Sequence, residues 1–291
     1  MLTAQQLVRE GTARLSQAGL PHARQEAEWL LSHLVGERPL EVYLRDADIP
    51  PAAIERFRAQ LEALASGVPL QYLLGEADFL GLRLEVGPGV FIPRPETEAI
   101  VQQAIEALRS LESRRGRPLQ LLDLGTGSGC IAAAIACALP SCVVVGIEVS
   151  WDTLQTARRN IQQHGLERRV RLLQGSWAEA IGSPVDGIIA NPPYLPSGQV
   201  DRLPPDVRQE PRGSLDGGPD GLRDLCYIMT AAARVLAPDG VLVMECGEEQ
   251  VEFLVRSAAA AAWVKTAQPL RDMAGRPRGI LVSRTICPAI G

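Results

Sequence analysis

The tetrapeptide Asn191-Pro192-Pro193-Tyr194 has residue types that could bind a reacting group. It directly follows the apolar run 185–190, which predicts a buried strand that ends there. Two successive prolines lack N–H donors and fix φ at about −65°, so the Asn191 side chain and the adjoining carbonyls face something other than a neighbouring strand. Such a corner can hold the NH2 group of a planar amide or amine. A Pro-rich strand exit capped by asparagine is the alternative interpretation.

A glycine turn lies upstream of this tetrapeptide. The apolar run 119–124 leads into Gly125-Thr126-Gly127-Ser128-Gly129 and then into the apolar segment 130–136. This order predicts a strand, a tight turn and a helix, which is the nucleotide-binding corner of an open α/β sheet. The glycines let the backbone approach a ligand, and the helix N-terminus offers free N–H groups to an anion. Cys130 stands where the dinucleotide fingerprint needs a third small residue, so the spacing points away from a dinucleotide.

An acid ends the next predicted strand, 142–148. Glu148 follows the glycine turn at a distance of about twenty residues, which is typical of a carboxylate that accepts hydrogen bonds from ribose hydroxyls. A solvent-exposed acid at a strand end is the alternative interpretation. The presence of the glycine turn and the Asn-Pro-Pro-Tyr corner in the same chain favours the ribose interpretation.

These motifs resemble those of the class I S-adenosylmethionine-dependent methyltransferases and, more narrowly, of the release factor glutamine methyltransferase family (PrmC/HemK). The glycine turn and the tetrapeptide alone indicate only a methyltransferase that acts on an amide or amine nitrogen. The run Ile-Pro-Arg-Pro-Glu-Thr-Glu at 92–98 narrows the resemblance to this family. Segments 75–79 and 272–278 add to it, so that it covers nearly the whole chain.

The resemblance implies S-adenosylmethionine as cofactor and a set of residues that bind it. It assigns Glu148 to the ribose and Trp177 to the adenine, although Trp177 could equally pack in the core. The remaining cofactor residues are Gly125, Thr126, Gly127, Ser128, Gly129 and Asn191. Where the family usually has an acid before the aromatic residue, this chain has Ser176, which predicts a weaker hold on the adenine amino group.

The implied substrate is the glutamine of the Gly-Gly-Gln loop in bacterial class I peptide chain release factors. In the family, the Asn side-chain oxygen and the first Pro carbonyl accept the two amide protons, and these roles fall to Asn191 and Pro192. Tyr194 would pack on the amide plane, while Pro193 would hold the turn. Orientation localises the nitrogen lone pair, and the methylated, protonated amide is acidic enough to need no catalytic base.

The hydrophobic pattern predicts three regions. Residues 1–74 carry helix-period patterns and form a small helical domain, interpreted as a substrate-recognition domain or, alternatively, as a stability cap. Alternation with glycines predicts a β-hairpin linker at 75–92. Residues 93–291 form the methyltransferase domain, a doubly wound, seven-stranded Rossmann-like α/β sheet. Apolar runs place its last three strands at 241–246, 263–267 and 280–283. By resemblance the last strand runs antiparallel. The Pro- and Gly-rich segment 192–219 predicts a rim over the substrate or a surface loop.

Composition agrees with an enzyme of this class. The chain has 291 residues, is 46% hydrophobic and has a net charge of −5, which argues against direct binding of nucleic acid. No membrane span or targeting signal is visible, so we expect a cytoplasmic protein without a membrane partner. We also expect it to act as a monomer. Six cysteines without a C-x-x-C pair read as buried thiols, and three isolated histidines predict no metal site.

The sequence leaves three alternative functions to be weighed against this one. A DNA adenine-N6 methyltransferase could hold the exocyclic amine in the same corner, but the acidic composition opposes it. Cys130 in the fingerprint opposes a nicotinamide-dependent oxidoreductase. A non-catalytic, cofactor-binding scaffold for translation factors would be indifferent to Asn191→Ala.

Overall fold

The computed structural model describes residues 2–44 and 49–285, which form two compact units. The smaller unit contains Met1–Glu76 with Leu203–Glu210, and the larger contains Ala77–Arg202 with Pro211–Gly291. Cys287, one of the six cysteines, lies outside the described residues.

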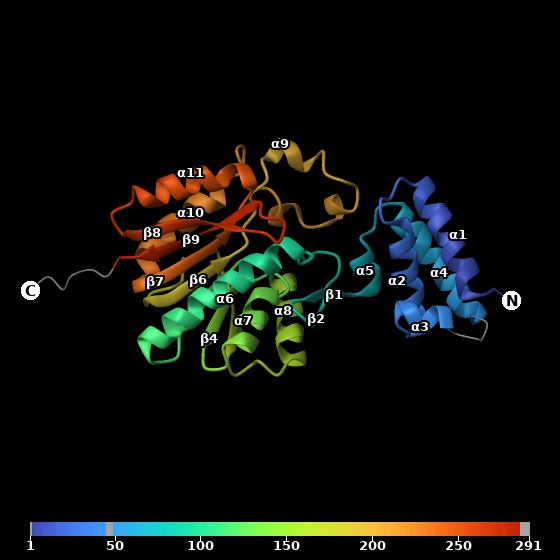
Figure 1. Ribbon diagram of the computed structural model, residues 1–291, viewed down its shortest axis with the longest axis horizontal. Helices are drawn as coiled ribbons and strands as arrows, with labels where there is room; N and C mark the ends of the chain where they lie inside the picture. Colours follow the sequence, from blue (N-terminus) through green and yellow to red (C-terminus); the bar gives the residue numbers. More distant parts are fainter. Residues whose placement is uncertain (1, 45–48, 286–291) are drawn as a thin grey trace, which may run out of the picture. The chain divides into compact units, whose positions relative to one another are not determined.

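The described part of the smaller unit contains five α-helices around one apolar core (Figure 1). On the first helix, Leu7, Val8, Gly11 and Leu15 are buried at the spacing that places residues on one helical face. They pack with Leu30 and Phe57, both completely buried. The helices are α1 (Ala4–Gln17), α2 (Ala23–Val35), α3 (Pro39–Leu44), α4 (Pro51–Ala65) and α5 (Leu70–Leu74). The predicted helical segment is therefore confirmed.

A β-hairpin follows, as the alternating pattern predicts. It consists of β1 (Glu76–Phe79) and β2 (Leu82–Glu85). Leu80 and Gly81 connect the strands with φ values of 48° and 79°, which are the left-handed values that a tight hairpin turn requires. Phe79 and Leu84 are completely buried in the core of the larger unit. The Leu80 N–H donates to the Glu98 carboxylate at 2.9 Å, so an acid of the 92–98 run braces the hairpin.

Within the described residues, seven strands of the larger unit form one sheet in the order β5-β4-β3-β6-β7-β9-β8. The first five in this order pair in parallel, whereas β9 is antiparallel to both β7 and β8. The predicted sheet and its reversed last strand are therefore confirmed. The strands are β3 (Gln120–Leu124), β4 (Val143–Glu148), β5 (Val170–Gln174), β6 (Val185–Ala190), β7 (Leu236–Glu245), β8 (Val264–Arg271) and β9 (Pro277–Arg284).

Helices cover both faces of this sheet (Figure 1). Successive strand side chains point to opposite faces, so Leu121 joins one core cluster and Leu122 joins the other. The first cluster includes residues of α6 (Pro95–Arg115), α7 (Cys130–Ala138) and α8 (Trp151–Gln163), and the second includes residues of α10 (Arg223–Val235) and α11 (Glu248–Ala259). The short elements after β6 are α9 (Ser197–Val200), η1 (Val207–Gln209) and η2 (Arg212–Ser214).

Two expectations about this unit are corrected. The last two strands are longer than the predicted ranges 263–267 and 280–283, because edge strand β8 carries mostly exposed polar residues that hide its pattern. Not all cysteines are buried, since Cys137 and Cys226 are exposed.

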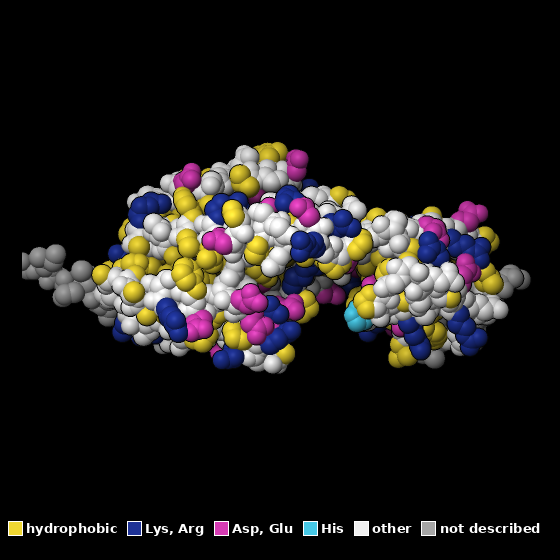
Figure 2. Space-filling view, turned by 90° about the horizontal axis from the view of Figure 1, so that it is seen from above, with side chains coloured by type: hydrophobic (Ala, Val, Ile, Leu, Met, Phe, Trp, Pro, Cys, Tyr) yellow, Lys and Arg dark blue, Asp and Glu magenta, His cyan; other side chains and the backbone are white. Residues whose placement is uncertain are grey.

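On the face shown in Figure 2, acidic and basic side chains are interspersed. No helix in the described ranges combines the length and apolarity needed to cross a membrane.

A close approach at Gly187 predicts a packing cost for Gly187→Ala. A Cβ atom on this glycine of β6 would lie 2.8 Å from a Leu108 methyl group and 2.9 Å from a Leu121 methyl group. Both leucines are buried, so shifting them disturbs the packing of the core. We expect the variant to lose about 1–3 kcal/mol of unfolding free energy in urea. The control is Gly182→Ala, where nothing lies within 4 Å of the added atom. Equal stability of the two variants would contradict the packing argument.

Candidate active site

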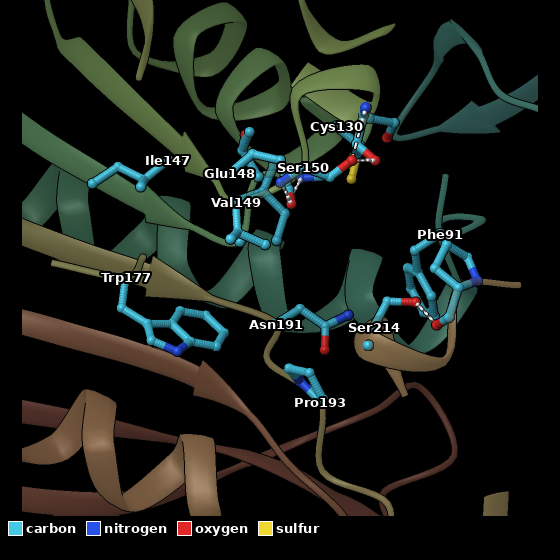
Figure 3. A pocket seen from close by; sticks show the side chains of 18 of the residues that line it. Phe91, Cys130, Ile147, Glu148, Val149, Ser150, Trp177, Asn191, Pro193 and Ser214 are labelled. Carbon is cyan, nitrogen blue, oxygen red and sulfur yellow. Dashed lines mark hydrogen bonds between the residues drawn. The ribbon is translucent and has the colours of Figure 1, made fainter. Parts of the chain in front are cut away.

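A cavity of about 300 Å³ lies in the larger unit, at the carboxyl ends of β3, β4 and β6 (Figure 3). Ligands of open α/β sheets bind at this edge of the sheet. Gly125, Thr126, Gly127 and Ser128 of the glycine turn line the cavity, together with Glu148, Trp177, Asn191 and Pro193. Gly129, the last residue of the turn, does not line it and instead packs beside Ala157. In Figure 3, Asn191 and Pro193 lie across the cavity from Glu148 and Val149. The structure thus brings together the three motifs that the sequence separates.

Backbone geometry fixes the glycine turn. The N–H groups of Gly125 and Thr126 both donate to the Ile147 carbonyl at 2.9 Å, which ties the turn to β4. Gly125 has a φ of 74°, and a Cβ atom there would lie 3.3 Å from the Trp177 ring. Both the backbone conformation and the lack of space therefore require glycine at this position.

Asp123, at the end of β3, stabilises the glycine turn through hydrogen bonds. Its carboxylate is fully buried and accepts hydrogen bonds from the Thr126 hydroxyl at 2.5 Å and the Ala132 N–H at 3.1 Å. Burial raises the pKa of Asp123 to about 7, and these two bonds act against the rise. Its sequence signal for this role is that a lone acid lies inside an apolar strand, where an unpartnered carboxylate would be costly.

Glu148 is held by backbone donors. One carboxylate oxygen accepts the Gly127 N–H at 3.1 Å and the other accepts the Ser150 N–H at 3.0 Å (Figure 3). The side chain is half-buried and lines the cavity. Since two carboxylate oxygens offer about four acceptor sites, two bonds leave capacity for ligand hydroxyls.

The Trp177 side chain contacts both the cavity and the hydrophobic core. It is half-buried, lines the cavity and packs against the core cluster that contains Ile188 and Leu242. Its φ of 45° is unusual for a residue with a side chain, and it places the indole beside Gly125. The two interpretations of Trp177 are therefore compatible. Ser176, which precedes it, is exposed and also lines the cavity.

The Asn-Pro-Pro-Tyr residues differ in their surroundings. Both prolines are buried, and Pro193 lines the cavity with Asn191 whereas Pro192 does not. The Pro192 carbonyl accepts no hydrogen bond from the described residues. Tyr194 is half-buried and its hydroxyl donates to a Glu245 oxygen at 3.2 Å. The Tyr194 carbonyl accepts a bond from the Gln250 side chain at 2.9 Å. The tetrapeptide is therefore tied to β7 and α11.

Two residues of this corner were missed from the sequence. Thr97, in the first turn of α6, accepts a hydrogen bond from Asn191 Nδ2 at 3.1 Å and is 2% exposed. Glu245, the last residue of β7, is also 2% exposed. Burial raises the pKa of Glu245 to about 7, and the nearby Thr97 and Tyr194 hydroxyls act against the rise. The run 92–98 served only to recognise the family, and the β7 segment was read as an apolar strand.

Part of the Pro- and Gly-rich segment packs behind this corner. A Cβ atom on Gly217 would lie 2.7 Å from the Pro193 carbonyl oxygen, and one on Gly221 would overlap the Tyr194 carbonyl oxygen. Pro211, Gly213 and Ser214 line the cavity. This segment is therefore part of the site wall and its support.

The buried Glu245 carboxylate predicts a pH-dependent cost in stability. Its folded-state pKa of about 7 exceeds the ordinary 4.5, so the folded chain binds the extra proton and loses stability as pH rises between these values. The slope is at most about 1.4 kcal/mol per pH unit. We expect Glu245→Gln to escape this loss, so that its advantage in urea unfolding grows from pH 5 to pH 8. The exposed control Glu249→Gln should show no such trend, and a pH-independent difference for Glu245→Gln would contradict the argument.

Comparisons with protein families and relatives agree with this arrangement. Residues 6–75 match the model of the PrmC N-terminal domain, and residues 117–275 match that of a methyltransferase domain. A release factor glutamine methyltransferase of Moorella thermoacetica is 39% identical, with 97% of this chain and 99% of the relative covered. A relative with the same name from Geobacter sulfurreducens is 41% identical, with 83% of both chains covered.

Solved structures support the fold. A methyltransferase from Pyrococcus furiosus aligns with a TM-score of 0.52 at 19% identity, covering 79% of this chain and 99% of the other. The hMettl16 catalytic domain aligns with a TM-score of 0.55 at 16% identity, covering 76% of this chain and 81% of the other. A relative matches over nearly its full length, two family models match, and the cavity has the corresponding geometry. This chain therefore belongs to the release factor glutamine methyltransferase family.

Proposed function

We propose that this chain transfers a methyl group from S-adenosylmethionine to the side-chain amide nitrogen of a glutamine in peptide chain release factors. The names of the near-full-length relatives support the reaction and the substrate. We further propose that the glutamine lies in the Gly-Gly-Gln loop of class I factors. The observation that carries the proposal is the orientation of Asn191, whose NH2 group is bound to Thr97 and whose carboxamide oxygen is left to accept from a substrate amide.

The cofactor is S-adenosylmethionine, which supplies an electrophilic methyl group on a positively charged sulfur. The site residues fit it, because a Cβ atom would close the backbone cradle at Gly125 and a fixed carboxylate stands at Glu148. We infer that Glu148 binds the ribose hydroxyls and that Trp177 contacts the adenine. The methionine part would lie against Gly125, Thr126, Gly127 and Ser128, which line the cavity with Asn191, and Gly129 would complete the turn that holds it.

Asn191 and Pro192 would orient the substrate amide. The Asn191 oxygen and the Pro192 carbonyl would each accept one N–H of the glutamine, which turns the nitrogen lone pair out of conjugation and towards the cofactor. Pro193 would hold the turn, and Tyr194, anchored at Glu245, would pack on the amide plane. No residue need act as base, since the protonated product amide gives its proton to water.

The helical region 1–74 is inferred to recognise the release factor. The match of residues 6–75 to the PrmC N-terminal domain supports a specialised module at this place in the chain. The hairpin at 75–92 would link it to the methyltransferase domain at 93–291. A DNA adenine-N6 methyltransferase is not favoured, because the relatives carry a release factor name.

Transfer of labelled methyl groups tests this proposal. The purified chain should label a class I release factor but neither its Gln→Ala variant in the Gly-Gly-Gln loop nor plasmid DNA. Asn191→Ala should lower kcat by about 100-fold or more, because it removes a preorganised partner of the reacting group. Labelling of DNA, or of the Gln→Ala factor, would contradict the proposal.

Cofactor binding gives a separate prediction at Glu148. Glu148→Gln keeps the size of the side chain but loses charge-assisted hydrogen bonds to the ribose, so we expect the Kd for S-adenosylmethionine to rise about tenfold in calorimetry. The control is the exposed Glu167→Gln, which should bind as the unmodified chain does. An unchanged Kd for Glu148→Gln would remove this residue from the cofactor site.

A further inference from the structure

Asn160 is a completely buried polar residue on α8 of the larger unit. It does not line the cavity, yet both ends of its carboxamide make hydrogen bonds to backbone groups of two other segments. A buried carboxamide costs free energy unless its groups are bound, so the partners of Asn160 indicate what it is for. These partners belong to the linker hairpin and to the glycine turn.

The first partner is the end of the hairpin strand β2. The Asn160 side-chain oxygen accepts the Glu85 N–H at 2.6 Å, and Asn160 Nδ2 donates to the Glu85 carbonyl at 3.0 Å. The carboxamide therefore binds both backbone groups of Glu85, as the peptide group of a neighbouring strand would. Since the hairpin has only two strands, its outer edges have no strand partner, and Asn160 takes that place at Glu85.

The second partner is the glycine turn. Asn160 Nδ2 also donates to the Ser128 carbonyl at 2.8 Å, and this bond is buried. The Gly129 N–H, at the other end of the same peptide group, donates to the Thr126 carbonyl at 2.8 Å. This peptide group needs such restraint, because Gly129 has a φ of 82° and glycine opposes backbone rotation only weakly. Ser128 lines the cavity, so Asn160 fixes the orientation of a peptide group in the cavity wall.

Other residues of α8 contact the same two segments. Thr153, Ala157 and Asn160 are all buried, at the spacing that places side chains on one helical face. The Thr153 hydroxyl donates to the Gly89 carbonyl at 3.0 Å, and Ala157 packs beside Gly129. Figure 1 shows α8 beside β2, and the segment that follows β2 forms a second part of the cavity wall, with residues Gly89, Phe91 and Pro93. This face of α8 therefore joins two walls of one cavity.

We propose that Asn160 is a positioning residue that couples cofactor binding at the glycine turn to the order of the linker hairpin. The inference rests on the proposed function in one respect, the placement of S-adenosylmethionine at that turn. One NH2 group bonds to both Ser128 and Glu85, so a turn held by the cofactor restrains Asn160, and Asn160 in turn holds the end of β2. The coupling is reciprocal, because a firmly held hairpin favours the form of the turn that binds the cofactor. Asn160 itself touches neither the cofactor nor the reacting atoms.

Amide hydrogen exchange, followed residue by residue by NMR, tests the coupling in the unmodified chain. The Glu85 N–H is bound to Asn160, whereas the Leu80 N–H of the same hairpin is bound to Glu98 at 2.9 Å and serves as internal control. The ligand is S-adenosylhomocysteine, the demethylated cofactor, at about 100 times its Kd. We expect it to slow exchange at Glu85 about tenfold and to change exchange at Leu80 by less than about twofold.

Two leucine variants of α8 separate this coupling from simple attachment of the hairpin. Asn160→Leu keeps the size of the side chain and removes its bonds to both segments. Gln163→Leu removes a bond from Gln163 Nε2 to the Arg83 carbonyl at 3.1 Å, which concerns the hairpin alone. We expect Asn160→Leu to raise the Kd for S-adenosylhomocysteine about tenfold in calorimetry and to abolish the ligand-dependent slowing at Glu85. Gln163→Leu should leave both quantities unchanged.

Melting temperatures establish that each variant is folded, and they also separate the proposal from a purely structural role. A structural role alone would lower the melting temperature of Asn160→Leu and leave its Kd unchanged. An unchanged Kd in folded Asn160→Leu would therefore overturn the inference, as would an equal rise in Gln163→Leu. Exchange at Glu85 that ignores the ligand, or that slows no more than exchange at Leu80, would also overturn it.

The unmodified chain keeps the test decisive if Asn160→Leu does not fold, because the comparison of Glu85 with Leu80 needs no variant. Failure of the unmodified chain to bind S-adenosylhomocysteine would overturn the placement of the cofactor and this inference with it. If the chain binds this ligand and the two amides respond as expected, but no release factor is methylated, the proposed substrate fails and the role of Asn160 stands.

Discussion

In-register parallel pairing of three central strands is the constraint on which the site depends. Leu124 of β3 pairs with Ala190 of β6, and Ala190 pairs with Met244 of β7. The residues that follow these paired positions are Gly125 after β3, Asn191 after β6 and Glu245 on β7. They therefore lie side by side at the carboxyl edge of the sheet. A shift of one residue in either pairing would turn side chains to the opposite face and separate the glycine turn from the Asn-Pro-Pro-Tyr corner.

A buried acid supports each half of the site. Asp123 accepts the hydroxyl of Thr126 at the glycine turn, and Glu245 accepts that of Tyr194 in the Asn-Pro-Pro-Tyr corner. Burial raises the pKa of both acids to about 7. Acids in such surroundings reduce folding stability as pH rises, while their oxygens accept hydrogen bonds that hold neighbouring groups in place. The site thus depends on groups that do not themselves line the cavity, since neither acid is among its walls.

Much of this architecture could be predicted from sequence, because its signals are local. The glycine turn, the acid at Glu148 and the Asn-Pro-Pro-Tyr corner each follow an apolar strand, and the structure gathers them around one cavity. The partners Thr97 and Glu245 could not be predicted in the same way. They are 94 residues before Asn191 and 51 residues after Tyr194, and only the strand order brings them together. Edge strand β8 was underestimated because exposure removes the apolar alternation on which strand prediction relies.

The central claim is that Asn191 and Pro192 orient a glutamine amide towards the cofactor. A crystal structure of this chain with the demethylated cofactor, S-adenosylhomocysteine, and a Gly-Gly-Gln fragment of a release factor tests it most directly. The account predicts the glutamine nitrogen within hydrogen-bonding distance of both the Asn191 side-chain oxygen and the Pro192 carbonyl, with Asn191 Nδ2 still on Thr97. A glutamine amide bound away from these two oxygens, or an Asn191 side chain that presents its NH2 group to it, would contradict the account.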